Sequence, residues 1–380
     1  MIHFDLSADA FRAQYFEQKP LHLPGALSAR PIAWSDIDRL LHVMDPQEPS
    51  VRIFQHGQIS QDAYLEEFSE AGQIRHRLNK VKFYDLMGRG ATLQINWLER
   101  HLIEAKRLCL EVGRFARAQT SGNAYMSFTG DGSFGQHWDT HDVFVIQLIG
   151  RKRWLIYEPT FALPLTLQTN DRSGQTCPAE PAIELILEEG DLMYIPRGWW
   201  HHVIPLQVGS FHLSVGCYLP TVFDYIVQMS AKYLEQELGA RRAFDASDFA
   251  GNVSALMQGL PAALLDPEKA KAFERDWVER ERLSSEFTLA ALASSNYLLS
   301  PGARLSLTTF SAPDLGNGTL HVNGRNLRLE PLNQTIVALL GDAGAMSFGA
   351  LREHLAGTPE DTLRGAVLDL ARYEIVTIAQ

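Results

Sequence analysis

The chain has 380 residues, of which 46% are hydrophobic and 21% are charged, and its formal net charge is −11. This length predicts two or three domains, each with a core of ordinary size. The acidic balance argues against a general nucleic-acid-binding protein, which usually carries a basic stripe, and favours a basic protein or peptide as partner. The three cysteines lack CxxC spacing, so they indicate neither a disulfide framework nor a cysteine zinc site.

The first residues, MIHFDLSADAF, lack the basic and apolar regions of a secretory signal peptide. No apolar run approaches the roughly 20 residues that are needed to span a bilayer. From these two observations we expect a cytoplasmic protein that does not associate with a membrane.

Residues 1 to about 120 mix short helical patterns with loops. The segment SADAFRAQYFEQKP predicts an amphipathic helix that is capped by Ser7 and ends before Pro20. In AWSDIDRLLHVM, Ser35 is the expected cap of the next helix. A further helix is expected in ERHLIEAKRLCLEVG, with its end at Gly113.

From Tyr125 to Tyr218 the pattern changes to short β-strands that are separated by Gly, Pro and Asp. The strand-like runs are AYMSF, DVFVIQLI, RWLIY, IELILEEGDLMYIP, HHVIPL and FHLSVGCYL. Several short strands at this spacing predict a sandwich or a barrel.

After Pro220 the sequence becomes helical, in DYIVQMSAKYLEQELGARRAF and DPEKAKAFERDWVERERLSSEFTLAALASS. From about residue 300, a hairpin signal at Asn323-Gly324 is followed by three short helical patterns and a final strand, an order typical of a winged-helix module. The last helical segment, PEDTLRGAVLDLARYE, carries more acidic than basic side chains, which disfavours contact with DNA phosphates. We expect this module to dock a protein or support a dimer.

Metal-capable side chains are crowded into GQHWDTHDVFVIQLIGRKRW, just before a buried strand. Alternate residues of a strand point to the same face, so His137 and Asp139 can chelate one cation while Trp138 points away. His3 and Asp5 share this spacing, so the pattern alone is a weak signal. The second copy, however, follows a glycine-rich approach, TGDGSFGQ, in which the backbone can run close to a site.

A third ligand is expected from the later segment EEGDLMYIPRGWWHHV, in which His201 opens a strand. Two imidazoles and one carboxylate form the facial triad of non-haem Fe(II) oxygenases. Hydrolytic zinc is the less favoured alternative for the same ligands. The expected metal-binding and catalytic residues are therefore His137, Asp139 and His201.

Several neighbours of the triad have structural as well as functional interpretations. Supporting or surface roles are expected for His141, Asp142 and His202. Contact with substrate and a structural role remain alternatives for Trp199, Trp200 and Asp131.

The combination of His-x-Asp, a lysine fifteen positions after the histidine and the segment GDLMYIPRGWWH resembles the JmjC-type cupin oxygenases, which use Fe(II), 2-oxoglutarate and O₂. Within them the chain is most similar to the bacterial ribosomal oxygenases, in YFEQKPLHLPGAL, HDVFVIQLIGRKRW and HLSVGCYLPT and in its order of domains. The resemblance implies a mixed fold with a mainly β core. It would have a double-stranded β-helix (cupin, jelly-roll) barrel over 1–219, a helical dimerisation region over 220–297 and a winged-helix-like domain over 298–380.

The resemblance also assigns the co-substrate residues. Lys152 falls where such enzymes place the cation that pairs with the far carboxylate of 2-oxoglutarate. Close bacterial relatives tend to have arginine there; either cation neutralises the carboxylate, although only arginine offers a planar fork. Thr129, aligned with a one-residue gap, and Ser214, on a late strand, are the other expected cofactor-binding residues.

The implied function is hydroxylation of a ribosomal-protein side chain with release of succinate and CO₂. The bacterial branch implies an arginine of the large-subunit protein that is sixteenth in standard naming, and the helical region is implied to form a homodimer. The alternatives are histidyl hydroxylation, lysine demethylation and a non-catalytic metal-binding cupin that serves as an adaptor. The intact triad together with Lys152 favours an enzyme.

Overall fold

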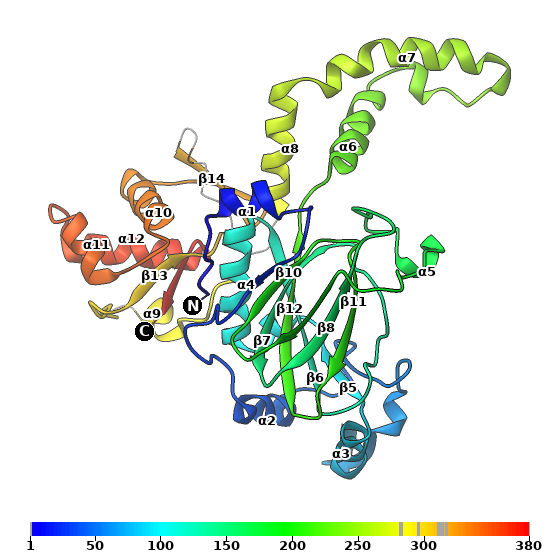
Figure 1. Ribbon diagram of the computed structural model, residues 1–380. Coiled ribbons are helices and arrows are strands. Elements are labelled where there is room, and N and C mark those ends of the chain that lie inside the picture. Colours follow the sequence, from blue (N-terminus) through cyan, green and yellow to red (C-terminus); the bar gives the residue numbers. More distant parts are fainter. Residues whose placement is uncertain (1, 281–283, 295–296, 310–314, 316–317, 380) are drawn as a thin grey trace. The chain divides into compact units, whose positions relative to one another are not determined.

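The structure is a computed structural model that describes residues 2–379 except 281–283, 295–296, 310–314 and 316–317. It comprises two compact units, Met1–Tyr218 and Leu219–Gln380 (Figure 1). The first unit ends beside the boundary that the sequence places after residue 219, and the further boundary after residue 297 stays a prediction.

Two antiparallel sheets form the body of the first unit. The larger sheet has seven strands in the spatial order β1 (Leu21–Leu23), β10 (Leu192–Ile195), β7 (Asp142–Ile149), β12 (Ser210–Tyr218), β6 (Gln119–Ser127), β5 (Thr92–Ile95) and β2 (Val51–Phe54). The smaller sheet has the order β11 (Trp200–Pro205), β8 (Lys152–Tyr157) and β9 (Ile183–Leu187). The strands expected between Tyr125 and Tyr218 are thus confirmed.

The two sheets pack face to face, because side chains from both meet in one buried cluster. The larger sheet contributes Val143, Val145, Met193 and Ile195, and the smaller sheet contributes Trp154, Ile156 and Leu187. This is the arrangement that alternating strands adopt when each sheet turns one apolar face inward. It confirms a mixed fold around a large antiparallel sheet (Figure 1), with a buried apolar cluster between the two sheets.

Helices cover the outer face of the larger sheet, which explains why β7 is buried on both sides. Phe144 of β7 packs against Phe11 of α1 and Phe115 of α4, with ring centroids 5.5 and 6.2 Å apart. The remaining elements of this unit are α1 (Ala8–Gln14), α2 (Trp34–Val43), η1 (Gln61–Ala63), β3 (Leu65–Glu70), β4 (Gln73–Leu78), α3 (Lys80–Gly88), η2 (Leu98–Arg100), α4 (Ile103–Ala116) and α5 (Asn170–Ser173).

The helix ends agree only in part with the sequence. Ser7 caps α1 as expected, accepting a hydrogen bond from the backbone N–H of Ala10 at 3.1 Å. The prediction for Ser35 is wrong: the cap of α2 is Ala33, two residues earlier, and the carboxylate of Asp36 accepts the backbone N–H of Ala33. The prediction that α4 ends at Gly113 is also wrong.

Helix α4 continues to Ala116 because Gly113 lies on its buried side, where it packs without a side chain. The chain leaves the helix at Arg117, whose φ of 55° is left-handed. The first residues of the expected helix belong instead to the short 3₁₀ helix η2.

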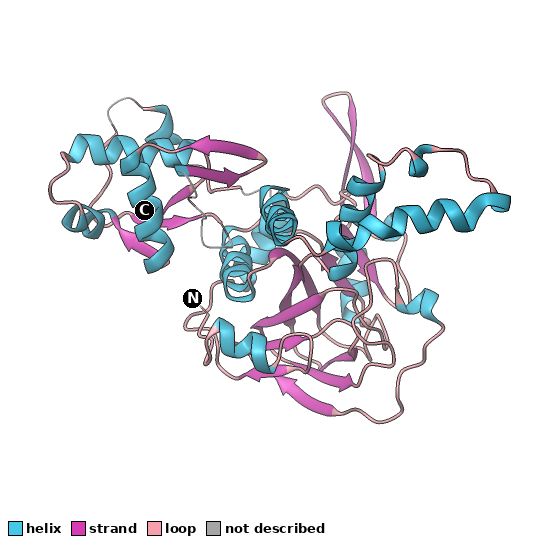
Figure 2. Cartoon of the chain, turned by 90° about the horizontal axis from the view of Figure 1, so that it is seen from above, coloured by secondary structure: helices cyan, strands magenta, loops and turns pink. Residues whose placement is uncertain are grey.

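The second unit begins with helices and ends with a small mixed module (Figure 2). Its elements are α6 (Val222–Leu234), η3 (Gly239–Arg241), η4 (Ala246–Asp248), α7 (Phe249–Leu264), α8 (Pro267–Arg280), α9 (Leu289–Ala293), β13 (Arg304–Leu307), β14 (Thr319–Val322), β15 (Arg325–Arg328), α10 (Pro331–Ala343), β16 (Ala345–Ser347), α11 (Phe348–His354), α12 (Glu360–Arg372) and β17 (Val376–Ala379). Helices α6 and α7 lie side by side.

Several expectations for this unit are confirmed. The hairpin β14–β15 turns at Asn323 and Gly324, whose φ values of 52° and 67° suit a type I′ turn. The three C-terminal helices and the last strand are present, and their apolar faces share one buried cluster. Helix α7 lies within the helical region expected over 220–297 but outside the two segments quoted for it, because it contains Pro261 and two glycines. Part of the helical run expected up to residue 295 lies outside the described residues.

Among the described helices, none combines the length and the apolar character required to cross a bilayer.

Candidate metal centre

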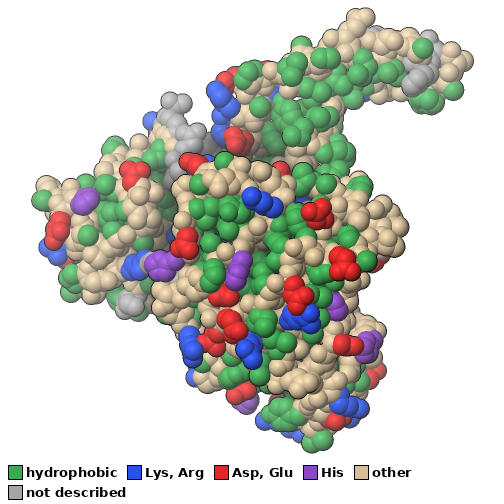
Figure 3. Space-filling model, viewed as in Figure 1, with side chains coloured by type: hydrophobic (Ala, Val, Ile, Leu, Met, Phe, Trp, Pro, Cys, Tyr) green, Lys and Arg blue, Asp and Glu red, His purple; other side chains and the backbone are tan. Residues whose placement is uncertain are grey.

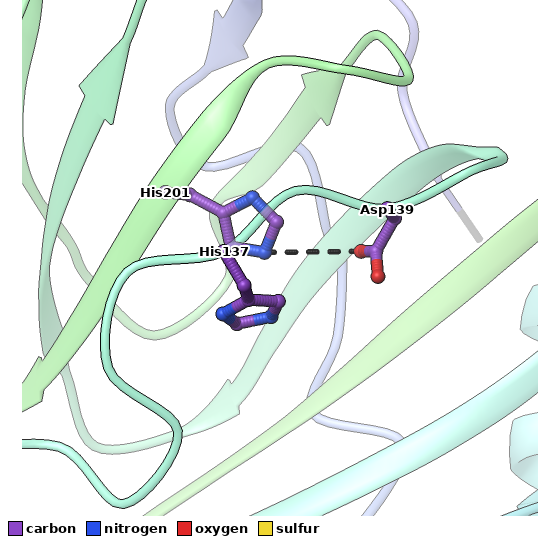
Figure 4. Close-up of side chains that lie close together, drawn as sticks. All are labelled: His137, Asp139 and His201. Carbon is purple, nitrogen blue, oxygen red and sulfur yellow. Dashed lines mark ion pairs between the residues drawn. The ribbon is translucent and has the colours of Figure 1, made fainter. Parts of the chain in front are cut away.

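His137, Asp139 and His201 converge at one point of the first unit, as Figure 4 shows. One ligand atom from each of the three side chains lies within 4.8 Å of the others. Nε2 of His201 is 3.7 Å from Oδ2 of Asp139, and the rings of the two histidines are 4.3 Å apart between centroids. Two imidazoles and one carboxylate at this spacing can bind one divalent cation on one side and leave its other positions open.

Backbone hydrogen bonds bring the three ligands together. His137 and His201 form an isolated β-bridge, in which the backbone N–H of each donates to the carbonyl of the other, at 3.2 and 2.8 Å. The backbone N–H of Gly198 donates to the carbonyl of Asp139 at 3.0 Å. His201 lies in β11, whereas His137 and Asp139 lie in the loop before β7, not inside a strand as the spacing suggested. The isolated β-bridge between His137 and His201, rather than a continuous strand, therefore aligns the ligands.

The histidine rings are oriented for metal binding by their other nitrogen atoms. Nδ1 of His137 lies 3.2 Å from the carbonyl oxygen of Gly135, and Nδ1 of His201 lies 3.2 Å from that of Trp199. A carbonyl only accepts, so each Nδ1 carries the proton and each Nε2 keeps its lone pair. Nε2 is therefore free for a metal ion in both rings.

The electrostatics of the cluster favour a cation. Burial opposes ionisation of Asp139, but the surrounding imidazoles, first His141 and then His201, hold its pKa below the usual range. Burial, reinforced by His137, lowers the pKa of His201 to about 4. At neutral pH the site thus offers one carboxylate and a neutral imidazole, the protonation states in which these groups bind metals.

The triad lies on the wall of a cavity between the two sheets. From the larger sheet it is lined by Thr92, Asn123, Tyr125, Ser127, Val143, Val145, Ile195, His212 and Ser214. From the smaller sheet it is lined by Lys152, Trp154, His201, Val203 and Pro205. Loop residues complete the wall, namely Gly132, Ser133, Phe134, His137, Asp139 and His141.

Lys152 is a buried cation in this cavity, with 2% of its surface exposed. Its Nζ lies 3.0 Å from Nδ1 of His212 and 3.5 Å from the carbonyl oxygen of Tyr125. Burial lowers the pKa of Lys152 to about 7, and burial together with Lys152 lowers the pKa of His212 well below its usual value. Asp139 is the one carboxylate among the described residues that line the cavity, so Lys152 has no anion beside it.

Two further residues of the lining carry a fully buried donor atom that has no hydrogen-bond partner among the described residues: the hydroxyl of Ser127 and Nε1 of Trp154. Buried polar groups in proteins are normally paired, so these atoms fit an anion with several oxygen acceptors. The sequence could have indicated that Trp154 lines the cavity, because it lies two positions after Lys152 and therefore on the same face of β8. His212 relates in the same way to Ser214.

The other expected co-substrate residues have different outcomes. Ser214 lines the cavity, as its place on β12 suggested. Thr129 does not belong to the described lining: it lies in the bend after β6 ends at Ser127, where the strand alternation no longer applies. Ser127, two positions earlier, lies among the residues that line the cavity.

The neighbours of the triad are mostly structural. Nε2 of His202 lies 3.1 Å from the backbone oxygen of Asp131, whose side chain is exposed. Trp200 is buried with Trp138 and Tyr157, and its Nε1 donates to Thr160. Three more residues are placed as follows: Trp199 packs on the cluster between the sheets, Asp142 is buried, and His141 lines the cavity.

Comparison with known proteins gives the class. Residues 98–225, which contain all three candidate ligands, match the family model of the JmjC domain. The JmjC match and the likeness in fold to a ribosomal oxygenase agree with the resemblance to JmjC-type cupin oxygenases of the 2-oxoglutarate class that the sequence showed. Fe(II) and 2-oxoglutarate are the metal and co-substrate of this class.

Individual matches agree with this class. The ribosomal oxygenase YcfD of Escherichia coli, in complex with cobalt and 2-oxoglutarate, has the same fold: the TM-score is 0.58 over 100% of both chains, at 18% identity. The bifunctional lysine-specific demethylase and histidyl-hydroxylase NO66 of Drosophila persimilis is 32% identical over 131 residues, 34% of this chain. The NO66 protein of Dictyostelium discoideum is 35% identical over 123 residues, 32% of this chain. This chain spans only 19% and 24% of these two relatives.

Proposed function

We propose that the protein is an Fe(II)- and 2-oxoglutarate-dependent hydroxylase that modifies a side chain of a ribosomal protein. The observation that carries this proposal is one cavity with His137, Asp139 and His201 at one place and, at another, the buried Lys152, which has no carboxylate beside it among the described residues of the lining. A metal ion bound by the three ligands and a dicarboxylate paired with Lys152 would together satisfy both groups of residues. In such a site iron, 2-oxoglutarate and O₂ supply the oxidative chemistry, in which 2-oxoglutarate becomes succinate and CO₂ and one oxygen atom enters a substrate C–H bond.

The residues present fit these groups. His137, Asp139 and His201 would hold the metal, with both histidines oriented by backbone carbonyls. Lys152 would neutralise the far carboxylate of 2-oxoglutarate, while the hydroxyl of Ser127 and Nε1 of Trp154 would donate to its oxygens. Burying the co-substrate between two sheets excludes water, which strengthens each of these interactions.

The substrate is proposed from the comparisons and from charge. The resemblance to bacterial ribosomal oxygenases implies an arginine of the large-subunit protein that is sixteenth in standard naming. A chain of net charge −11 suits a basic ribosomal protein. The same charge argues against direct binding to DNA.

One observation favours histidine as a second candidate target. Among the described residues that line the cavity, the only carboxylate is Asp139, which is taken up by the metal. The guanidinium of a substrate arginine that entered this cavity would be buried without a carboxylate to pair with, which costs free energy. The neutral imidazole of a substrate histidine would avoid this cost. NO66, a relative over about a third of this chain, carries histidyl-hydroxylase in its name.

An intact-mass comparison tests the reaction and the target together. Large-subunit ribosomal proteins from a strain that lacks this gene would be incubated with the enzyme, Fe(II) and 2-oxoglutarate. We expect one protein to gain one oxygen, and fragmentation of that protein to place the oxygen on an arginine or a histidine. The matched Asp139→Ala variant should give no gain. Released formaldehyde would instead indicate lysine demethylation.

A non-catalytic cupin adaptor is the alternative from another class. It predicts no oxygen consumption with iron and 2-oxoglutarate, whatever basic protein is added. Lys152 argues against it, because a buried lysine that pairs with no anion is a cost that an adaptor has no reason to keep.

For the second unit we propose homodimerisation through the helical region and a winged-helix-like C-terminal module that docks protein. Apolar side chains are exposed along α6, and Figure 3 shows hydrophobic side chains on the helices of this region. Val222, Phe223, Ile226 and Val227 each expose at least 44% of their surface. Patches of this kind usually mark a protein interface. Light scattering should give the mass of a dimer, and Ile226→Glu should reduce it to that of a monomer.

A further inference from the structure

Arg197 joins three distant segments of the first unit through its buried side chain. It lies in the turn between β10 and β11, and only 11% of its side chain is exposed. Its Nη2 donates to Oε1 of Glu17 at 2.6 Å, and its Nη1 lies 3.9 Å from Oδ2 of Asp142. Its backbone N–H also donates to Oδ1 of Asp142, at 3.4 Å.

Tyr194 closes this set of contacts. Its hydroxyl donates to Oδ1 of Asp142 at 2.6 Å and accepts the backbone N–H of Glu17 at 3.0 Å. Glu17, Asp142, Tyr194 and Arg197 therefore form a cluster in which each member contacts at least two others. We refer to these four residues as the Arg197 cluster.

The cluster lies in the same two segments that carry metal ligands. Asp142 comes three residues after Asp139, and Arg197 comes four residues before His201. Between them, the backbone N–H of Gly198 donates to the carbonyl of Asp139. The side-chain cluster and this backbone bond thus tie the Asp139 segment to the His201 segment at neighbouring points.

The N-terminal segment is the third participant, through Glu17. This residue has a φ of 59°, a left-handed conformation that favours glycine, yet its carboxylate is aimed at Arg197. Without Glu17, the guanidinium would keep only the longer contact to Asp142. A buried charge that loses its partner is strongly disfavoured, so the turn would be expected to shift toward other acceptors or water.

We propose that Arg197 is a positioning residue for the metal centre, and that Glu17 makes the N-terminal segment part of its support. The cluster sets the separation between Asp139 and His201, and with it the affinity for the metal. This inference rests on the metal centre proposed above. Residues that hydrogen-bond directly to metal ligands typically change metal affinity by about 10- to 100-fold when altered, and we expect the lower end of this range for a cluster that acts through the backbone.

Cobalt(II) binding by the full-length protein tests the proposal. Glu17→Gln keeps the size of the side chain but removes its charge, and should weaken cobalt affinity at least tenfold and change the cobalt absorption bands that report ligand geometry. Arg197→Met should do the same, and Arg197→Lys should recover part of the affinity because it keeps the charge. The matched control is Glu184→Gln, which breaks the exposed pair between Arg153 and Glu184, 2.6 Å apart, and should change nothing.

The outcomes separate this inference from the proposed function. A wild-type protein that binds no cobalt would count against the metal centre itself. Wild-type binding with unchanged affinity and spectrum in folded Glu17→Gln and Arg197→Met would overturn the positioning role alone. If either variant does not fold, Glu17→Asp and Arg197→Lys take their place: both keep the charge but change the reach, so a shifted cobalt spectrum supports the role and an unshifted one refutes it.

Discussion

Nζ of Lys152 and Nδ1 of His212 lie 3.0 Å apart and come from opposite sheets of the sandwich. An ammonium group can only donate, so Nδ1 of His212 accepts, and the ring proton resides on Nε2. The pair therefore fixes the lysine without a counter-charge. It leaves the positive charge of Lys152 available to an incoming anion.

The first prediction is a pH dependence of 2-oxoglutarate binding. Burial lowers the pKa of Lys152 to about 7, so the free protein loses this charge as the pH rises through that value. The dissociation constant for 2-oxoglutarate should then increase above pH 7, by up to roughly tenfold per pH unit. Anaerobic titration calorimetry between pH 6 and 9 measures it. Lys152→Arg is the control, since arginine stays charged; a flat profile for the wild type would contradict the prediction.

The second prediction concerns stability. The pKa of Lys152 is about 7 in the folded protein and about 10.4 in the unfolded chain. Between these values the unfolded chain binds more protons, so the free energy of unfolding rises with pH. Lys152→Met removes the buried charge. It should therefore raise the melting temperature by roughly 2 to 6 °C at pH 7 or below while abolishing co-substrate binding.

The same melting experiment provides its own check at alkaline pH. The stabilisation by Lys152→Met should shrink between pH 7 and pH 10, where the folded wild type carries a neutral lysine. Equal melting temperatures of the two proteins at pH 7 would mean that Lys152 is not paying a desolvation cost in the folded state.

The third prediction concerns which of two nearby hydroxyl groups, that of Ser127 or that of Thr129, binds 2-oxoglutarate. The hydroxyl of Ser127 is buried in the cavity with no hydrogen-bond partner among the described residues, whereas Thr129 lies outside the described lining. Ser127→Ala should raise KM for 2-oxoglutarate about tenfold, the usual effect of losing a hydrogen bond to a charged group. Thr129→Ala should leave KM unchanged. The rate of succinate formation gives KM for both variants. A raised KM in Thr129→Ala and an unchanged KM in Ser127→Ala would contradict the prediction and favour Thr129, the residue that the resemblance indicated.

These two residues also illustrate what a sequence can predict. The convergence of the three candidate ligands could be predicted from local sequence, because their residue types and the glycine-rich approach are unusual together. The strands could be predicted because their alternation of apolar and polar residues is regular. Which hydroxyl of this segment lines the cavity depends on where β6 ends. That end is set by the bend at 128–130, which a one-residue gap in an alignment cannot locate.

Long-range contacts were outside the reach of local patterns. The link from Glu17 to Arg197 joins residues 180 positions apart, and neither side chain differs locally from an ordinary surface charge. Asp142 was expected to be a supporting or surface residue, and only the packing of β7 between two layers revealed its burial. Helix α7 lies between the two segments in which helices were expected, because Pro261 and two glycines give its sequence a poor helix propensity.

The fourth prediction tests the turn that delivers Lys152 to the cavity. Gly150, between β7 and β8, has a φ of 65°, and a Cβ atom there would lie 2.2 Å from the carbonyl oxygen of Gly209. Gly150→Ala should thus suffer both backbone strain, about 1–3 kcal/mol, and a clash with a backbone atom that cannot rotate away. Gly174 has nearly the same φ, 66°, but no atom within 4 Å of the added Cβ.

Gly174→Ala is therefore the matched control, since it carries the strain without the clash. Urea unfolding should show a larger loss of stability for Gly150→Ala than for Gly174→Ala, and the difference measures the clash alone. Because Lys152 follows Gly150 by two residues, only Gly150→Ala should also raise KM for 2-oxoglutarate. Equal losses of stability in the two variants would mean that the β7–β8 turn can move away from Gly209, and that Lys152 is held by His212 and its strand rather than by the turn.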